Sequence, residues 1–258
     1  STVVCAMDTI VTKKARKLAG EITLPGDKSI SHRAIMFGAL ASGAVGIEGL
    51  CTGEDTGRTL TIIRQLGIEV EQPGPRSLVI NGRGMRGLRE PDDVLYAGNS
   101  GTTMRLMTGL LSAQPFFSVL SGDASLHRRP MKRVVEPLRM MGADISGRRG
   151  GDFPPLAVRG CSLRGITHTL PVASAQVKSA LLLAGMYSDG VTTVIEPSLS
   201  RDHTERMLQF LGAPLHGHGA AVAIRQCDEL RPAQLHIPGD ISSAAFFIVA
   251  GLIVPHAE

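Results

Sequence analysis

Residues 24–33, Leu-Pro-Gly-Asp-Lys-Ser-Ile-Ser-His-Arg, carry the side chains best suited to binding an anion. They end a strand-like segment and lead into an apolar helix predicted over residues 34–40, whose first turn holds Lys28, Ser29 and Arg33. Free N–H groups and the positive end of the helix dipole face outward at a helix start, so two cations there indicate a bound anion. A solvated turn with two exposed cations is the alternative that the motif alone leaves open.

Two more helix starts carry groups of the same kind. Residues 99–105, Asn-Ser-Gly-Thr-Thr-Met-Arg, form a turn in which Gly101 lets a ligand approach the backbone closely. Residues 122–130 place Arg129 before a helix predicted to start with Pro130, and arginine binds carboxylate or phosphate through two parallel hydrogen bonds. Ordinary helix capping and an exposed charge pair are the respective alternatives.

Two further predicted helices also begin with polar side chains. Residues 174–178, Ser-Ala-Gln-Val-Lys, open one helix, and residues 200–203, Ser-Arg-Asp-His, open the next. Capping alone explains either segment taken singly. Together, the helix starts carry cations whose convergence favours a multiply charged anionic ligand. These cations are Lys28, Arg33, Arg129, Lys178 and Arg201.

Other kinds of catalytic site are not indicated. The sequence shows no Ser-His-Asp set, dinucleotide fingerprint or paired carboxylates. His216 and His218 have no third ligand nearby, so no metal site is expected. The available acids Asp55, Asp202 and Asp240 each suit a helix cap, and an obvious general acid or base is absent.

The composition predicts a reduced, soluble, cytoplasmic protein. A net charge of +4 and 3% aromatic residues suit a small acidic substrate better than nucleic acid. The basic run at residues 13–17 is short and is typical of a solvated face. Four widely spaced cysteines predict free thiols, and the longest apolar run, residues 244–254, is too short to span a bilayer.

The chain repeats with a period of about seventy residues. Small-residue turns that open helices recur at residues 26–29, 98–102, 172–176 and 239–243. In each unit the first helix is apolar on all sides and the second is amphipathic. The apolar helices are predicted at residues 34–40, 104–111 and 180–186, with strands at residues 77–80, 156–158, 192–195 and 221–224. The pattern of each unit therefore predicts β-α-β-α-β-β, with one set of helices inside and the sheets outside.

A fourth unit starts at residues 235–240, which echo residues 22–27, and it supplies one helix before the sequence stops at Glu258. That apolar helix is left without a covering layer. We therefore expect the chain to be a fragment, or one half of a two-chain assembly.

In combination these motifs resemble the 5-enolpyruvylshikimate-3-phosphate synthase family (3-phosphoshikimate 1-carboxyvinyltransferases), in the form often called class II, from about residue 15 onward. The resemblance implies an α/β fold, an inside-out α/β barrel of two three-unit domains that the chain crosses twice. The crossings are implied at residues 23–26 and 237–240. One domain, residues 27–237, is then nearly complete, whereas residues 1–26 and 238–258 are part of a second.

The family transfers the enolpyruvyl group of phosphoenolpyruvate to the 5-hydroxyl of shikimate 3-phosphate, through a tetrahedral adduct, and releases phosphate. No metal or organic cofactor is implied, and glyphosate is the inhibitor. The catalytic residue by motif match is Lys28. Shikimate 3-phosphate is implied to contact Lys28, Ser29, Arg33, Ser174, Ala175 (through its backbone), Gln176 and Arg201. Phosphoenolpyruvate is implied to contact Lys28, Gly101, Arg129 and Gln176. Many members carry a second serine at the position of Ala175.

The resemblance also implies that the acidic residues for proton transfer lie in a C-terminal part that this sequence does not cover. We therefore expect the isolated chain to bind shikimate 3-phosphate weakly and to need a complementary C-terminal half for turnover. One alternative is a non-catalytic sugar-phosphate-binding module. Another is a UDP-N-acetylglucosamine enolpyruvyltransferase, whose loop cysteine has no counterpart among the four cysteines here.

Overall fold

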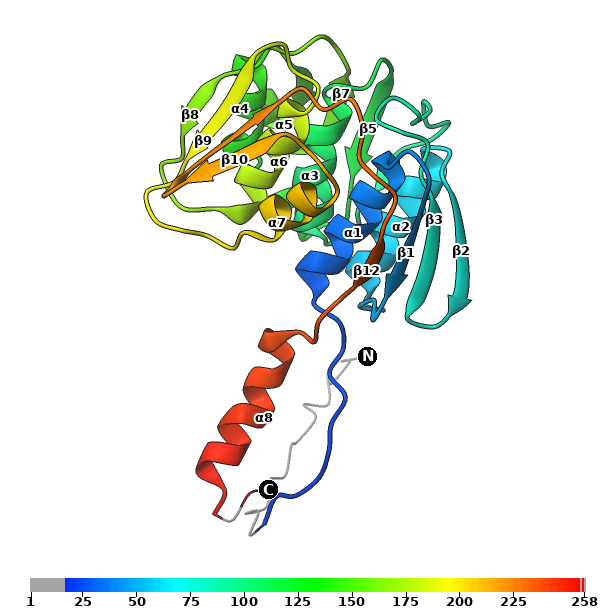
Figure 1. Ribbon diagram of the computed structural model, residues 1–258. Coiled ribbons are helices and arrows are strands. Elements are labelled where there is room, and N and C mark those ends of the chain that lie inside the picture. The colour runs from blue at the N-terminus through cyan, green and yellow to red at the C-terminus, as the bar shows by residue number, and fades with distance from the viewer. Residues whose placement is uncertain (1–16, 256, 258) are drawn as a thin grey trace, which may run out of the picture.

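Three helices buried on nearly all sides form the centre of the molecule (Figure 1). The computed structural model describes residues 17–255 and 257. The central helices are α1 (Lys28–Leu40), α3 (Gly101–Leu111) and α6 (Ala175–Gly185). Each starts earlier than its apolar segment predicts, because a polar side chain caps it: Asp27, Ser100 and Ser174 accept hydrogen bonds from backbone N–H groups of the first turn.

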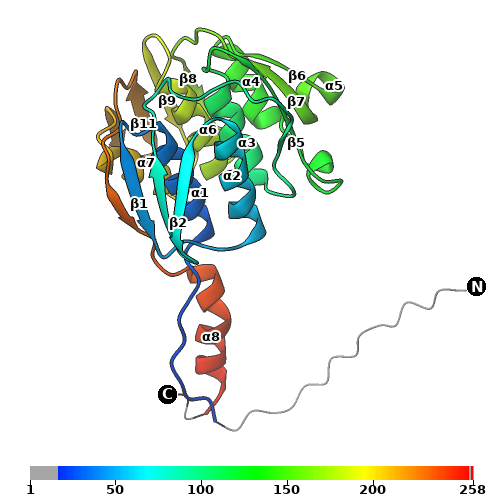
Figure 2. The same cartoon turned by 90° about the vertical axis from the view of Figure 1, so that its right-hand side faces the viewer.

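Three four-stranded sheets surround these helices, one for each repeat (Figures 1 and 2). The first has the order β12 (Gln234–His236), β1 (Ala44–Glu48), β3 (Ser77–Asn81), β2 (Glu69–Gly74). The second has the order β4 (Leu95–Tyr96), β5 (Phe117–Ser121), β7 (Phe153–Arg159), β6 (Asp144–Gly147). The third has the order β8 (Thr167–Thr169), β9 (Val191–Ile195), β11 (Ala221–Arg225), β10 (Leu215–His218). The predicted arrangement of helices inside and sheets outside is confirmed.

Amphipathic helices complete the repeats and bury one face each. They are α2 (Glu54–Gln65), α4 (Lys132–Met140) and α7 (His203–Phe210). Two single turns, η1 (Leu126–Arg128) and α5 (Arg148–Gly151), lie in the second repeat. The predicted start of α4 at Pro130 is wrong, because the helix begins at Lys132. Met131 occupies the N-cap position without a side-chain hydrogen bond, and its N–H donates to Asp152 O at 2.8 Å.

The strand predicted before Pro25 is wrong. Residues 17–25 have no regular structure, and only an isolated bridge joins Gly26 to Gly239. The first-strand position of the first repeat is taken instead by β12, which pairs in parallel with β1. The strand β12 is favoured at this position because it buries an apolar side chain: Leu235 on β12 is 8% exposed, whereas Ile22 is 51% exposed.

Residues 25–27 lie beside residues 238–240 at the end of the three-repeat part of the molecule, and we call this pair of segments the crossing. Asp27 N donates to Pro238 O at 2.8 Å, and Asp240 N donates to Pro25 O at 2.9 Å. A Cβ on Gly26 would lie 1.9 Å from Gly49 O, so no side chain fits at this crossing.

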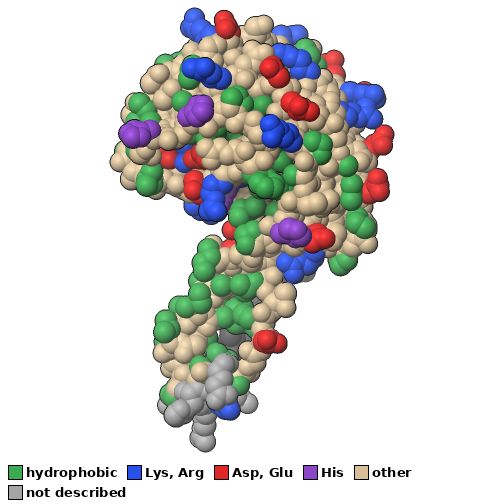
Figure 3. Space-filling model, viewed as in Figure 1, with side chains coloured by type: hydrophobic (Ala, Val, Ile, Leu, Met, Phe, Trp, Pro, Cys, Tyr) green, Lys and Arg blue, Asp and Glu red, His purple; other side chains and the backbone are tan. Residues whose placement is uncertain are grey.

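Helix α8 (Ile241–Ile253) projects from the crossing, beside the extended residues 17–25 (Figures 1 and 2). Its apolar side chains line the projecting part of the surface (Figure 3), and of its residues only Ala244 is buried. Phe246 and Leu252 are each 80% exposed. Across residues 17–255, helices are too short or too polar to cross a lipid bilayer.

Candidate functional site

The start of α1 meets the start of α7 to form the first of two clusters of predicted ligand-binding residues. This first cluster contains Lys28, Ser29, Arg33 and Arg201. Arg201 Nη1 lies 3.5 Å from Ser29 Oγ although the two residues are 172 positions apart. Arg33 Nη1 donates to Ser29 O at 2.8 Å. The fold therefore brings together side chains that the sequence predicted at separate helix starts.

Lys28 is half-exposed and makes an ion pair. Its Nζ lies 3.0 Å from Asp55 Oδ2, on the first turn of α2. Asp55 was predicted to be a helix cap, and its observed contact with Lys28 is one that no local pattern shows. An anion that binds Lys28 competes with the Asp55 carboxylate for the ammonium group. The Lys28–Asp55 ion pair is weak because the lysine is half-exposed.

Arg33 lies on the second turn of α1, not on the first as predicted, and it is 2% exposed. Its Nε donates to Thr204 Oγ1 at 2.6 Å, and its Nη2 donates to Ser179 Oγ at 2.8 Å. Burial lowers the pKa of the Arg33 guanidinium to about 10, so the group stays charged at neutral pH. Arg33 thus fastens α1 to α6 and α7 and adds positive charge beneath Ser29.

The second cluster gathers around Gly101 and contains Arg105, Arg129 and Gln176. Arg105 Nη1 donates to Gln176 Oε1 at 2.6 Å, and a Cβ on Gly101 would lie 2.8 Å from Arg105 Nη1 and 3.2 Å from Arg129 Nη1. Burial, followed by Arg129 and Arg133, lowers the pKa of Arg105. Among residues 17–255, Arg105 and Arg129 have no carboxylate within 4.0 Å, so this positive charge is uncompensated.

The first turn of α6 joins the two clusters. Ser179 Oγ, which accepts from Arg33, donates to Ala175 O at 2.5 Å, and Gln176 follows directly. Ser174 caps the same turn. Hydrogen bonds therefore link Arg201, Ser29 and Arg33 to the start of α6, and they link Gln176 there to Arg105. Arg129 lies near Arg105 beside Gly101, and Lys28 precedes Ser29, so cations from three repeats gather at one end of the central helices.

One predicted member of the cationic set does not belong to it. Lys178 is 3% exposed, and its Nζ lies 2.6 Å from Glu196 Oε2 and 2.5 Å from Glu205 Oε1. Its charge is neutralised inside the protein. The prediction that Lys178 faces an anionic ligand is wrong because a helix start shows nothing of carboxylates 18 and 27 residues further along the chain.

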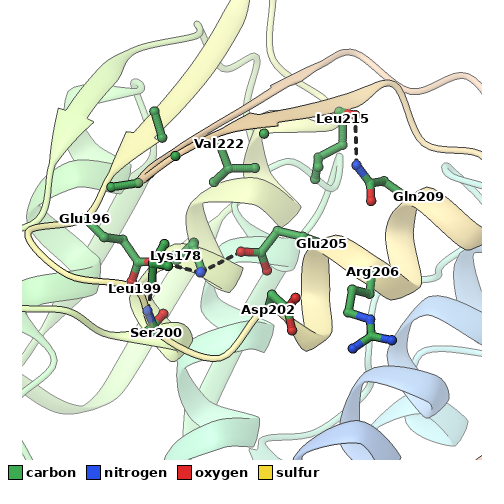
Figure 4. Close-up of a pocket in the computed structure, with 14 residues that line it drawn as sticks. Lys178, Glu196, Leu199, Ser200, Asp202, Glu205, Arg206, Gln209, Leu215 and Val222 are labelled. Atoms are coloured by element: carbon green, nitrogen blue, oxygen red, sulfur yellow. Dashed lines mark hydrogen bonds and ion pairs between the residues drawn. The ribbon is translucent and has the colours of Figure 1, made fainter.

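Beside Lys178 lies a cavity of about 290 Å³ (Figure 4). Its charged lining residues are Lys178, Glu196, Asp202, Glu205 and Arg206. Carboxylates outnumber cations here, so this cavity does not suit a phosphate. The clusters at the helix starts, rather than this cavity, have the charge that an anionic substrate needs.

Other candidate chemistry is sparse in the part of the chain that the structure describes. Across residues 17–255, no three side chains of His, Cys, Asp or Glu gather as a metal site. Cys51, Cys161 and Cys227 are free thiols, as predicted. Cys5 and residues 13–16 of the basic run lie outside the described residues. Arg105 had no predicted role, although its place one helical turn after Gly101 was a usable signal.

The buried His32 makes the stability of the fold depend on pH. It is fully buried, with Nδ1 hydrogen-bonded to Thr59 Oγ1 at 2.7 Å, and burial lowers its pKa from 6.5 to about 3. Between those values the unfolded chain binds a proton that the folded chain does not, so stability falls as the pH falls. We expect His32 to cost about 2 kcal/mol between pH 7 and pH 5.

Urea unfolding of the wild type and of His32→Gln at both pH values measures this contribution. Glutamine keeps a hydrogen-bonding group near Thr59 but does not titrate. The variant is expected to lose less stability on acidification by the stated amount, and an equal loss in both proteins would contradict the assignment.

The three repeats, with helices inside and sheets outside, define a protein of the inside-out α/β class, in which helix starts bring cationic side chains together. The sequence matches the EPSP synthase family (3-phosphoshikimate 1-carboxyvinyltransferase) over residues 12–258, and the chain belongs to this family. The 3-phosphoshikimate 1-carboxyvinyltransferase of Geotalea daltonii is 58% identical over 247 residues, which are 96% of this chain and 57% of the relative.

Two other proteins indicate the same family. The enzyme of the same name from Geotalea uraniireducens is 57% identical over 252 residues, covering 98% of this chain and 58% of the relative. A solved EPSP synthase from Acinetobacter baumannii superposes with a TM-score of 0.88 and 48% identity, covering 93% of this chain and 54% of that one. This chain therefore spans somewhat more than half the length of the relatives it matches.

Proposed function

We propose that this chain supplies the sugar-phosphate side of an enzyme that transfers the enolpyruvyl group of phosphoenolpyruvate to the 5-hydroxyl of shikimate 3-phosphate and releases phosphate. The observation that carries the proposal is the meeting of cations from three repeats at the starts of the central helices, where Arg105 and Arg129 have no carboxylate within 4.0 Å among residues 17–255. Both substrates are multiply charged anions, which is the ligand chemistry that such a site stabilises. Family membership supplies the particular reaction.

The first cluster binds shikimate 3-phosphate in this proposal. Arg201 and Ser29 hold the phosphate directly, and Arg33 adds charge from below. The turn of Ser174, Ala175 and Gln176 contributes a hydroxyl, a backbone N–H and an amide. Alanine at position 175 lacks the hydroxyl that many members are implied to have there, so the backbone carries more of the contact.

The second cluster, with Lys28, binds phosphoenolpyruvate. Arg129 faces its phosphate or carboxylate, Gly101 leaves space for close approach, and Gln176 touches both substrates. Lys28 is the catalytic cation that neutralises charge as the hydroxyl adds to the enolpyruvyl carbon. The hydroxyl proton leaves as the oxygen bonds to the enolpyruvyl carbon, and the methylene carbon gains a proton to become a methyl group. As the C–O bond to phosphate then breaks, the methyl group loses a proton, which restores the double bond.

Those proton transfers need free acidic groups near Lys28. Among residues 17–255, Asp202 precedes α7 without the predicted side-chain cap, but the acids that contact or precede Lys28 are engaged. Asp55 is paired with Lys28, while Asp27 and Asp240 cap helices. We assign the proton transfers to a complementary C-terminal half, which would pack with residues 17–26 and with α8. Residues 27–237 then form the substrate domain, residues 1–26 and 238–258 belong to the second domain, and the assembled enzyme acts in the cytoplasm.

Mixing this chain with a separately expressed C-terminal half of a close relative tests the proposal. Phosphate release that depends on shikimate 3-phosphate and phosphoenolpyruvate is expected from the mixture, and none from either half alone. Turnover by this chain alone would contradict the division of labour. A mixture that binds neither substrate would contradict the function.

Glyphosate is expected to inhibit the complemented enzyme by occupying the phosphoenolpyruvate site, and Gly101→Ala is expected to weaken that inhibition. The new Cβ would lie 2.8 Å from Arg105 Nη1 and 3.2 Å from Arg129 Nη1. Both atoms end flexible side chains, so the variant folds while its anion site narrows. Inhibition should weaken by about tenfold or more.

The KM for each substrate provides the comparison within the same protein. The KM for phosphoenolpyruvate should rise less than the inhibition constant, and the KM for shikimate 3-phosphate should stay near its wild-type value. Unchanged inhibition would refute the placement of Gly101 beside the phosphoenolpyruvate site.

A further inference from the structure

The buried Lys178 joins two turns that carry proposed ligands of the sugar phosphate. It lies on the first turns of α6, and its backbone N–H donates to Ser174 O at 3.0 Å. Its Nζ contacts Glu196 and Glu205, and the side chains of the three residues are 4%, 3% and 13% exposed. Figure 4 shows the ammonium group between the two carboxylates.

Each carboxylate belongs to a different segment beside Arg201. Glu196 follows β9, and its Oε2 accepts from Ser200 N at 3.4 Å, immediately before Arg201. Glu205 lies on the first turn of α7, three residues into the helix and next to Thr204. Through Glu196, Lys178 is connected to the residues before the turn at 200–202, and through Glu205 it is connected to the residues after that turn. Lys178 itself lies on the helix whose start forms the turn at residues 174–176.

Burying the charges of this network costs free energy, and its two carboxylates are balanced by two cations. Burial acts to raise the pKa of Glu196, but hydrogen bonds from Lys178 and Ser200 outweigh it, so the pKa lies below its usual value. The buried Arg33 adds a second cation, and Glu205 is the nearby charge that most opposes the lowering of its pKa. Packed apolar residues stabilise a core as well as a buried ion pair does, so stability alone does not account for this arrangement.

We propose that Lys178, acting through Glu196 and Glu205, is a positioning residue for shikimate 3-phosphate. It fixes the turn at residues 174–176 relative to the turn at residues 200–202, so that both meet the ligand without rearrangement. It does not touch the ligand itself. This inference rests on the proposed function of the same site.

Two single substitutions test the inference, since each weakens one arm of the network and leaves the other ion pair in place. Glu205→Gln keeps the Lys178–Glu196 pair, and Glu196→Gln keeps the Lys178–Glu205 pair. Glu69→Gln is the matched control, because Glu69 also pairs with a cation, Arg83 at 3.2 Å, but is exposed on β2 away from both turns.

Three quantities are measured on each protein, with the chain alone and with the C-terminal half added. They are the Kd for shikimate 3-phosphate by calorimetry, the amide hydrogen-exchange rates of residues 172–176 and 199–202, and the melting temperature. Both network variants are expected to raise the Kd by about tenfold or more, because small displacements of positioned groups are costly. Exchange in both turns should accelerate together, and the control should match the wild type.

A lower melting temperature with unchanged Kd and unchanged exchange in the turns would show a purely structural role and overturn the inference. Weakening of binding by Glu69→Gln to the same extent as by the network variants would overturn it as well. If the wild type fails to bind shikimate 3-phosphate even with the C-terminal half, the proposed function itself is wrong, and this inference falls with it.

Discussion

Lys28→Met in the complemented enzyme is expected to lower turnover by about 100- to 1,000-fold, the usual loss when a group that stabilises transition-state charge is removed. Methionine keeps the unbranched side chain up to the ε position and removes the ammonium group that lies 3.0 Å from Asp55. The variant also leaves that carboxylate facing the substrate anions without its counterion. Steady-state assays of phosphate release, with both substrates saturating, measure the effect.

The appropriate control is Lys132→Met. Lys132 is an exposed lysine at the start of α4, paired with Glu136 at 3.4 Å, and its removal is expected to leave turnover within twofold of the wild type, about the effect of a surface ion pair. Near-normal turnover by Lys28→Met would remove Lys28 from the catalytic machinery.

Gly26→Ala is expected to reduce the free energy of unfolding by about 3 kcal/mol, the upper part of the range for forced overpacking. The added Cβ would meet Gly49 O at 1.9 Å and Cys51 N at 3.0 Å, which are backbone atoms that cannot rotate away. Residue 26 and residues 49–51 must move apart to admit it. Urea unfolding followed by circular dichroism gives the change.

Gly57→Ala is the matched substitution, because its Cβ would find open space on α2. Helix propensity predicts a gain of about 0.5–1 kcal/mol there. Equal stabilities for the Gly26 and Gly57 variants would mean that the crossing is looser than its contacts indicate.

Local patterns were sufficient to predict the central helices. Runs such as residues 180–186 are apolar on all sides, which is typical of a fully buried helix, and Ser100 and Ser174 mark where such helices start. The seventy-residue period then implied that equivalent helix starts lie near one another. The observed contact between Ser29 and Arg201 joins the start of α1 to the start of α7, which are not equivalent positions, so the period alone did not predict it.

Long-range pairing was beyond the reach of those patterns. Residues 22–24 alternate as a strand does, but β12 packs Leu235 into the same sheet and takes the position. Lys178 resembled the other cations because its two carboxylate partners lie in other elements. Asp55 resembled a helix cap for the same reason. In each case the partner is distant in sequence, and only the fold identifies it.

Titration of the isotope-labelled chain with shikimate 3-phosphate, followed by amide NMR, tests the central claim most directly, with unphosphorylated shikimate as the comparison ligand. We predict saturable shifts at Ser29, Gln176 and Arg201, much weaker effects from shikimate, and no change in the acidic cavity at Gln209. Equal responses to the two ligands, or shifts confined to that cavity, would contradict an anion site at the meeting of the helix starts.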